Sequence, residues 1–149
     1  MRIYLDLCCL KRPFDAQDQP LVRLQTEAVV SILALPAELA EFVRAPAQAL
    51  ENSFNPVQAR REAVDLWLGQ VSVPSFSDEA ASARIADMIE MGFKSFDAFH
   101  LASAELFGAD VFLTVDLPLL KLATRLSAQL RVRAADPVRF LEEISQWTH

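Results

Sequence analysis

Short apolar runs of strand length alternate with segments of helical periodicity along the chain, and this alternation limits the possible folds most strongly. We expect strands over residues 2–9, 41–45, 71–74, 111–115 and 131–135. Because parallel strands need a helical crossover, the pattern predicts βαβ units with helices on both faces of one sheet. The prediction is an α/β fold, a three-layer α/β/α sandwich around a central parallel sheet of about five strands.

The helical segments begin and end at residues that favour helix termini. Ser77, followed by two acids, predicts the start of one helix, and Gly92 predicts its end. Pro118 predicts the first turn of a later helix, where its missing N–H does no harm. The first helix stops before Pro36. Its apolar spacing predicts an inner face made of Leu21, Leu24, Ala28, Ile32 and Leu35.

A chain of 149 residues with 52% hydrophobic residues can bury one sizeable core. No repeat, low-complexity tract or linker interrupts the alternation, so we expect a single domain over residues 1–149. No apolar run reaches the ~20 residues of a membrane span, and the N-terminus lacks the pattern of a signal peptide. Cys8 and Cys9 are adjacent and poorly placed to bridge each other. A cytoplasmic protein without membrane association is expected.

The formal net charge of −6 argues against a protein that coats nucleic acid by electrostatic attraction. It argues less strongly against an enzyme, because a cluster of acids lowers the net charge before its cation binds. An activity on RNA therefore stays open.

Three acids fall where the carboxyl ends of parallel strands meet at one edge of the sheet. Asp6 lies toward the end of the first strand, Asp116 follows the strand at 111–115, and Asp97 opens a helix. Ligands of open parallel sheets bind at this edge. Like charges gathered there must share protons or bind a hard divalent cation. Without a cluster of thiols or histidines nearby, the set favours Mg²⁺ or Mn²⁺ over zinc.

Each of these acids also has a structural explanation. Asp116 can be the N-cap of the helix that follows it, which would leave one oxygen free for a metal. Asp97, in a first helical turn, can serve the helix dipole alone, an effect worth under ~1 kcal/mol. Asp6 is harder to explain in this way, because an ionised acid inside an apolar strand is costly unless it is paired or bound to a metal. On these residues alone, a structural role and a cation site shared with Asp6 both stay open for Asp97 and Asp116.

Four short motifs occur in a fixed order along the chain. They are IYLDLCCL at the start, ALENSF after the second expected strand, SFDAFHLASAE in the central helix and FLTVD after the fourth expected strand. Together they resemble the PIN-domain ribonucleases, and in particular the VapC-like toxins of bacterial toxin–antitoxin pairs. The resemblance implies an acidic site made of Asp6, Glu51, Asp97 and Asp116. With it, we expect Asp97 and Asp116 to cap their helices and also to share one cation site with Asp6.

Three positions in or directly after these motifs differ in how well they match the family: Glu51, Thr114 and Leu117. The sequence alone places Glu51 in a surface turn of a short helix, and only the resemblance points it inward. Thr114 matches a hydroxyl position near the family's site. The family often has a second acid after the TxD, where this chain has Leu117. That departure puts a further ligand in doubt and leaves the core site intact.

The resemblance also implies an activity and partners. The activity is a Mg²⁺-dependent (or Mn²⁺-dependent) endoribonuclease that cleaves single-stranded RNA by metal-activated water, with no covalent intermediate. Asp6, Asp97 and Asp116 would hold the metal, and Glu51 would complete the cluster or orient water. Family members commonly form homodimers and are neutralised by an antitoxin protein whose tail covers the acidic groove. The net charge of −6 suits a basic inhibitory segment.

Other conspicuous side chains have structural explanations as well. His100 lies three residues after Asp97 on the same helix face, where a buried histidine with a satisfied hydrogen bond is commoner than a general acid or a group that supports a ligand. We expect core packing, and no base stacking, for Phe93, Phe96, Phe99 and Phe107. Basic residues flank the expected site and can contact phosphates, although solvated surface charge is their commoner role: Lys11, Arg12, Lys94 and Lys121.

Two other interpretations stay open. The chain can be a PIN fold that binds a cation or a partner without cutting. A haloacid-dehalogenase-like phosphatase also places an acid after its first strand, but its DxDxT motif has a second acid where this chain has Cys8. Metal-dependent cleavage that is abolished by Asp6→Asn separates an enzyme from a binding protein.

Overall fold

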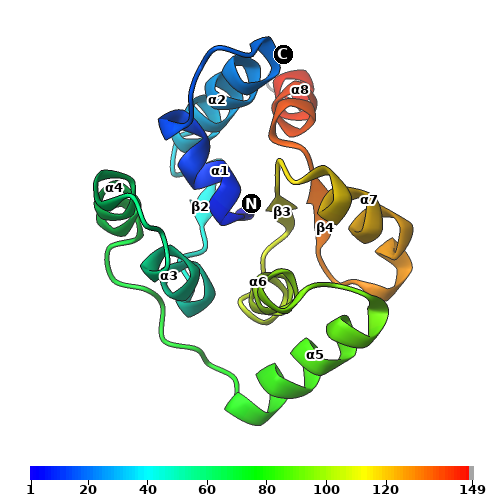
Figure 1. The fold of residues 1–149 in the computed structure, drawn as a ribbon. Coiled ribbons are helices and arrows are strands. Elements are labelled where there is room, and N and C mark those ends of the chain that lie inside the picture. The colour runs from blue at the N-terminus through cyan, green and yellow to red at the C-terminus, as the bar shows by residue number, and fades with distance from the viewer. Residues whose placement is uncertain (148–149) are drawn as a thin grey trace.

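The computed structural model describes residues 1–147 and contains one parallel sheet of four strands with helices around it (Figure 1). The strands are β1 (Arg2–Leu5), β2 (Glu41–Phe42), β3 (Val111–Leu113) and β4 (Arg133–Ala135). Their order across the sheet is β2-β1-β3-β4, so β1 and β3 are central. Leu5 lies opposite Leu113, and Leu113 lies opposite Ala135, so three strands end at the same edge.

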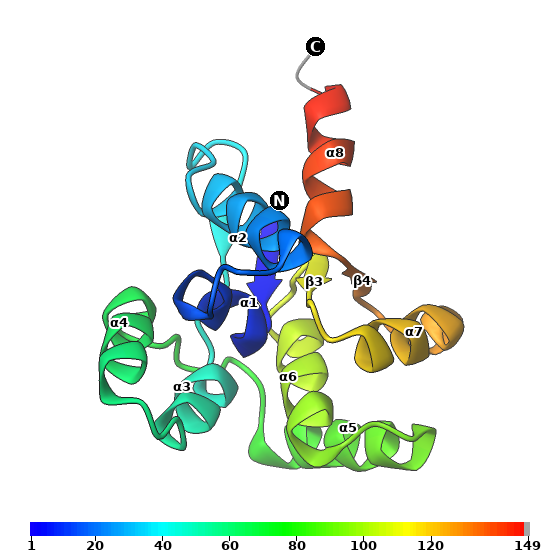
Figure 2. The same cartoon turned by 45° about the horizontal axis from the view of Figure 1, so that its top comes forward.

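The helices of the described chain connect the strands or follow them. They are α1 (Leu7–Lys11), α2 (Pro20–Leu33), α3 (Pro46–Ser53), α4 (Gln58–Leu68), α5 (Asp78–Met91), α6 (Ser95–Leu106), α7 (Leu117–Arg125) and α8 (Pro137–Trp147). Figures 1 and 2 show α2 and α8 on one side of the sheet and α5 and α6 on the other. None of these helices is long and apolar enough to span a membrane.

Alternate residues of each strand point to opposite faces of the sheet, and this alternation creates two hydrophobic cores. Leu5 and Leu113 pack into one core, together with side chains of α1, α2, α4 and α8. Tyr4 and Phe112 pack into the other core, together with side chains of α5, α6 and α7. Helices therefore cover both faces of a parallel sheet, as the alternating sequence pattern predicts.

The prediction of about five strands is wrong, because residues 71–74 do not join the sheet. This segment makes one backbone hydrogen bond toward its neighbour, from Ser72 N to Arg44 O at 2.7 Å. Val73 is 89% exposed, so no apolar contact holds it against the sheet. Pro74 has no N–H to donate, and a strand ladder cannot form there.

The first strand is also shorter than predicted, since it ends at Leu5 and residues 7–11 form α1. Asp6 is the N-cap of α1, and its Oδ1 accepts a hydrogen bond from Leu7 N at 2.8 Å. A capping side chain gives the backbone an alternative to the strand, which explains why the apolar run CCL becomes helical.

The inner face of α2 differs from the predicted one. Leu21 and Leu24 are exposed, and the buried residues of the helix are Gln25, Ala28, Val29 and Ile32. The predicted stripe and the observed stripe share Ala28 and Ile32. The predicted helix termini are confirmed at Ser77, whose side chain accepts from Ala80 N, and at Gly92, which takes the left-handed conformation that ends α5.

Candidate metal centre

Asp6 stands between the end of β1 and the start of α1, and hydrogen bonds fix both of its carboxylate oxygens. Oδ1 accepts from Leu7 N, and Oδ2 accepts from the Thr114 hydroxyl at 2.8 Å and from the Cys8 thiol at 3.2 Å. The residue is buried and outside the strand, which corrects the expectation of an acid within a strand. Its donors offset part of the cost of burying its charge.

Glu51 enters from α3 and meets His100 of α6 beside Asp6. His100 Nε2 lies 3.4 Å from Glu51 Oε2 and 4.0 Å from Asp6 Oδ1. One possible ligand atom from each of the three residues lies within 4.8 Å of the others. Glu51 therefore points inward, as the resemblance implied, and does not sit on a surface turn. Asp6, Glu51 and His100 form a group that can hold a metal ion.

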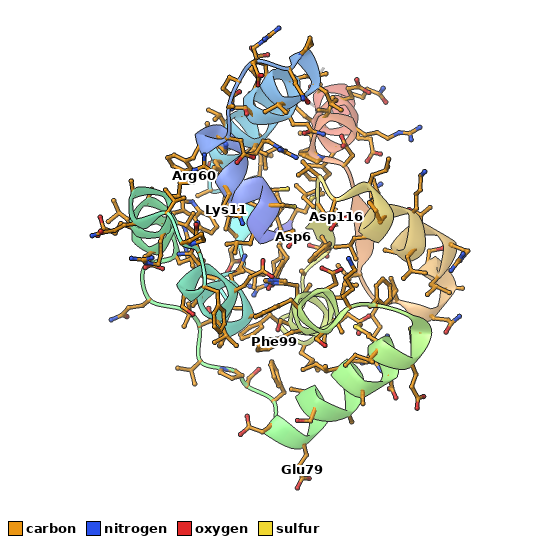
Figure 3. The ribbon with its side chains drawn as sticks, in the orientation of Figure 1. Asp6, Lys11, Arg60, Glu79, Phe99 and Asp116 are labelled. Atoms are coloured by element: carbon orange, nitrogen blue, oxygen red, sulfur yellow. The ribbon has the colours of Figure 1, made fainter. Side chains whose placement is uncertain are left out.

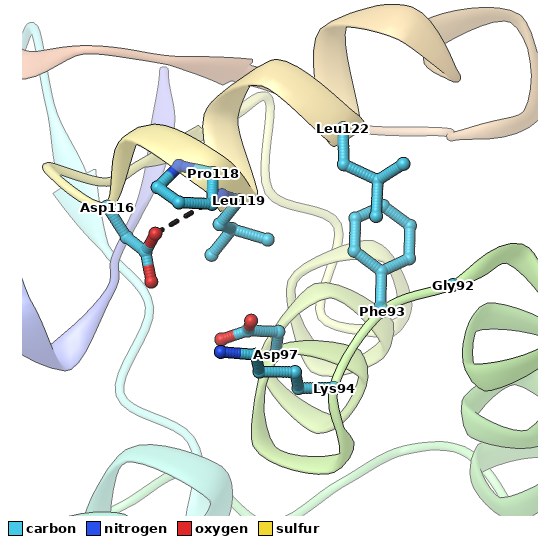
Figure 4. Close-up of a pocket in the computed structure, with 8 residues that line it drawn as sticks. All are labelled: Gly92, Phe93, Lys94, Asp97, Asp116, Pro118, Leu119 and Leu122. Carbon is cyan, nitrogen blue, oxygen red and sulfur yellow. Dashed lines mark hydrogen bonds between the residues drawn. The ribbon is translucent and has the colours of Figure 1, made fainter.

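Asp97 and Asp116 face one another across a pocket between α6 and α7 (Figure 4). Asp116 is the N-cap of α7, since its Oδ1 accepts from Leu119 N at 3.2 Å, which confirms one of its two predicted roles. Asp97 lies in the first turn of α6 but is not its N-cap, because Lys94 holds that position. The expectation that both acids cap their helices is thus wrong for Asp97. Lys94 also lines the pocket, which encloses about 120 Å³.

The electrostatics connect this pocket to the other acids. The pKa of Asp97 is raised from 3.8 to about 6, first by burial and then by the negative charges of Asp6 and Asp116, with a smaller contribution from Glu51. His100 acts in the opposite direction. Burial and the neighbouring acids both disfavour the ionised form of Asp97, which a bound cation would stabilise. Three of the four expected site acids, Asp6, Asp116 and Glu51, therefore act on the fourth, Asp97.

Glu51 behaves differently because a nitrogen and a lysine are close to it. Burial alone would raise the pKa of Glu51, but the His100 side chain and, to a smaller extent, Lys11 lower it further than burial raises it, so the pKa lies below its usual value. Figure 3 shows Lys11 and Asp6 near one another, with Asp116 across from them. Glu51 is thus held as an anion that is available as a ligand.

Cys8 and His100 lie next to the acids, although the sequence analysis gave neither of them a role in the site. The preference for Mg²⁺ or Mn²⁺ over zinc depends on the absence of a cluster of thiols or histidines, yet the Cys8 thiol donates a hydrogen bond to Asp6 and lies 3.4 Å from the Thr114 hydroxyl. A signal was present, because Cys8 follows Asp6 by two residues and His100 follows Asp97 by three. Neither spacing distinguishes a site neighbour from a core residue.

The aromatic and basic side chains near the site divide into several classes. Phe93 is buried and lines the Asp97 pocket, while the remaining members of the aromatic set are partly buried: Phe96, Phe99 and Phe107. Arg12 forms an ion pair with Asp15 at 2.9 Å, and Lys121 is exposed. Lys94 and Lys11 are the flanking basic residues that the geometry connects to the acids.

The donor set fits a divalent cation. Several carboxylates converge, and the pKa of one of them, Asp97, is raised first by burial and then by the negative charges of the others. His100 Nε2 is buried and completes no hydrogen bond within residues 1–147. Carboxylate oxygens suit Mg²⁺ and Mn²⁺, and an added imidazole would extend the range toward softer metals.

Comparisons with known proteins show the fold of the chain. No family model matches the sequence, and no curated protein matches it. The structure of VapBC-1 from nontypeable Haemophilus influenzae matches with a TM-score of 0.58 and 13% sequence identity, over 92% of this chain and 98% of that chain. FitAcB from Neisseria gonorrhoeae matches with a TM-score of 0.55 and 17% identity, over 91% of this chain and 97% of that chain. At these identities the likeness is one of fold alone.

Proposed function

We propose that the protein is a Mg²⁺-dependent (or Mn²⁺-dependent) endoribonuclease that cleaves single-stranded RNA and serves as the toxin of a toxin–antitoxin pair. The observation that carries the proposal is the convergence of Asp6, Glu51, Asp97 and Asp116 at one edge of the sheet. The fold shared with VapBC-1 and FitAcB supports it, as do the four motifs that resemble VapC-like toxins.

The proposed roles follow from where the acids lie. Asp6, Asp97 and Asp116 hold the cation, and Glu51 completes the cluster or orients the attacking water. When bound, the cation supplies a positive charge for the phosphodiester oxygens and activates water for attack. Thr114 and the start of α1 keep Asp6 in a fixed orientation. The reaction passes through no covalent enzyme intermediate, because water is the nucleophile.

Lys94 has a proposed role toward the substrate. Its side chain lines the same pocket as Asp97 and Asp116, and Figure 4 shows it beside Asp97. A protein with a net charge of −6 does not attract RNA over its whole surface. A basic group at the rim of the site would offset the repulsion between the acids and the RNA phosphates there. We assign Lys94 to the phosphate that enters next to the cation.

The proposed partners are an RNA substrate, an antitoxin protein and a second copy of the chain in a homodimer. A basic antitoxin segment would complement the acidic centre and the net charge of −6. The solved structures with the same fold carry the names of VapBC-1 and FitAcB, which supports a paired partner for this chain.

The first experiment is a cleavage assay on mixed single-stranded RNA with Mg²⁺, Mn²⁺ or EDTA. Wild type and Asp97→Asn are compared with Glu79→Gln, which removes an exposed acid from the first turn of a different helix. Figure 3 shows Glu79 at the far edge of the molecule from Asp6 and Asp116. We expect metal-dependent cleavage by wild type and by Glu79→Gln, and none by Asp97→Asn. A folded, metal-bound wild type that cuts no RNA would favour the binding-only interpretation.

The toxin assignment has a separate test in living cells. Expression of the wild-type chain is expected to arrest growth, and co-expression of the antitoxin from the adjacent gene is expected to relieve the arrest. Asp6→Asn is the matched control, since it should be expressed without arrest. Unchanged growth under wild-type expression would count against a toxin and leave the nuclease assignment to the cleavage assay.

A further inference from the structure

His100 is held in a fixed orientation at the back of the acidic centre. The residue is wholly buried, with its ring edge-on to Tyr4 at 5.8 Å between centroids and 6.4 Å from the ring of Phe96. Its Nδ1 forms a hydrogen bond of 2.7 Å with the Tyr4 hydroxyl. Its Nε2 is directed toward Glu51 and Asp6 but completes no hydrogen bond in the described chain. The expectation of a buried histidine with satisfied hydrogen bonds is therefore met at one nitrogen and fails at the other.

The hydrogen bond with Tyr4 determines which nitrogen carries the proton. A phenol hydroxyl carries one proton to donate, and His100 Nδ1 is its hydrogen-bond partner within residues 1–147. If Tyr4 donates to Nδ1, the proton of the neutral ring is on Nε2. The reverse arrangement would leave the buried Tyr4 proton without an acceptor and would turn a lone pair of Nε2 toward two carboxylates. The first arrangement avoids both costs.

We propose that His100 is a positioning residue, whose Nε2–H holds Glu51 in the metal centre while Tyr4 holds His100. The distance of 3.4 Å from Nε2 to Glu51 Oε2 is slightly long for a completed bond, and it allows the carboxylate to turn when a cation enters. This inference rests on the metal-binding part of the proposed function. It adds a chain of contacts, Tyr4 to His100 to Glu51, that joins β1, α6 and α3.

Direct ligation of the metal by His100 is the competing interpretation. A nitrogen that carries a proton cannot coordinate a cation, so ligation would require the proton to leave Nε2 and the Tyr4 hydrogen bond to reverse. Protein groups that orient metal ligands through hydrogen bonds commonly contribute about 10–100-fold to metal affinity, which gives the size of the expected effect. Both interpretations predict weaker metal binding when His100 is replaced, so the test must separate them.

The test is the affinity of the purified chain for Mn²⁺, measured from the electron paramagnetic resonance signal of the free ion. We expect His100→Leu to weaken Mn²⁺ binding by about tenfold or more and Tyr4→Phe by a smaller factor. His100→Gln should recover part of the loss, because its amide N–H can reach toward Glu51. Ser103→Ala, which alters a buried residue one turn further along α6, should bind Mn²⁺ like wild type. Thermal unfolding of each variant checks that it is folded, and Tyr4→Phe carries the test if His100→Leu is not.

A double-mutant cycle with Glu51→Gln shows whether His100 acts through Glu51. In the Glu51→Gln background, His100→Leu should change the Mn²⁺ affinity by less than about twofold. A full tenfold loss in that background would overturn the proposal. Magnetic coupling between bound Mn²⁺ and a nitrogen nucleus in wild type, lost in His100→Gln, would also overturn it, because it would identify His100 as a ligand.

The outcomes separate this inference from the proposed function. Mn²⁺ binding that depends on His100 and Glu51 together, without cleavage of any RNA, would overturn the nuclease and keep the positioning role. RNA cleavage with an Mn²⁺ affinity that is unchanged in His100→Leu and Tyr4→Phe would keep the nuclease and overturn the positioning role. A wild type that binds no Mn²⁺ would overturn both.

Discussion

The Thr114 hydroxyl donates a hydrogen bond of 2.8 Å to Asp6 Oδ2, although 108 positions separate the two residues in the chain. The same hydroxyl oxygen accepts a hydrogen bond of 3.1 Å from the backbone N–H of Asp116. One buried hydroxyl thus links two acids that follow adjacent strands, β1 and β3. The TxD sequence provides this link, because it places the hydroxyl directly after the end of β3 and the acid two residues beyond it.

Thr114→Val tests this link, since valine keeps the shape of the side chain and removes the hydroxyl. We expect the variant to lose about 1–3 kcal/mol in the free energy of unfolding, because buried groups on Asp6 and Asp116 lose a partner. Urea unfolding measures the change. Thr124→Val is the control at an exposed position of α7, where the change should stay within about 0.5 kcal/mol. Equal stability of the two variants would contradict the link.

Asp116 has two roles that a pair of substitutions can separate. Asparagine is as good an N-cap as aspartate, whereas alanine is a poor one, so only Asp116→Ala should lose about 0.5–2 kcal/mol of stability. Both variants should lose affinity for Mn²⁺, because both remove a carboxylate from the centre. Thermal unfolding without metal and Mn²⁺ titration provide the two readouts. Ser77→Ala, which removes the cap of α5, should lose stability and keep its affinity for Mn²⁺.

The raised pKa of Asp97 makes the stability of the metal-free protein depend on pH. The pKa in the folded state, about 6, lies above the ordinary value of 3.8, so the folded protein binds more protons between these values. The contribution of Asp97 to stability is therefore present below about pH 4 and is lost as the pH rises through 6. In EDTA, Asp97→Asn should be more stable than wild type at pH 7.5 by about 1–2 kcal/mol, after allowance for solvent screening of a half-buried group.

The measurement is a series of thermal unfolding curves from pH 4 to pH 8 in EDTA. The difference between Asp97→Asn and wild type should disappear near pH 4, while Glu79→Gln should follow wild type at every pH. Added Mn²⁺ should reverse the order above pH 6, because only the wild type keeps the ionised carboxylate that binds the cation. If the difference in stability between Asp97→Asn and wild type stayed constant from pH 4 to pH 8, the pKa of Asp97 would not be raised in the folded protein.

Leu101 tests the core on the α6 side of the sheet, and the exposed Leu66 is its control. Leu101 is wholly buried in α6, one residue after His100, whereas Leu66 is 84% exposed on α4. Leu101→Ala should therefore lose about 2–5 kcal/mol in the free energy of unfolding, and Leu66→Ala less than about 0.5 kcal/mol. Urea unfolding measures both. A small loss at Leu101 would contradict the packing of α6 against the sheet.

The sequence contains enough information to predict the arrangement of the acids but not their detailed contacts. Parallel strands end at a common edge, so an acid after each of two strands had to approach the other, as Asp6 and Asp116 do. The start of α7 at Asp116 also follows from local chemistry, since an N-cap needs only its own helix. These predictions succeed because each depends on a few neighbouring residues or on one topological rule.

The wrong predictions depended on contacts between distant segments. The sequence shows a short apolar run at 71–74, but its failure to join the sheet depends on what lies beside it, and Val73 has nothing to pack against. The buried face of α2 depends on how the helix packs on its neighbours, and it includes Gln25 while Leu21 and Leu24 are exposed. The inward position of Glu51 likewise depends on the meeting of α3 and α6, which no local pattern records.

The order of the strands in the sheet has a consequence for the protein while it is being synthesised. β1 lies between β2 and β3, and its partner β3 leaves the ribosome more than a hundred residues later. The acids at positions 6 and 51 are translated well before those at 97 and 116. A nascent chain that ends before residue 111 lacks both Asp116 and the strand β3, which precedes the Thr114 that holds Asp6. The proposed ribonuclease would thus stay inert until most of its own message has been translated.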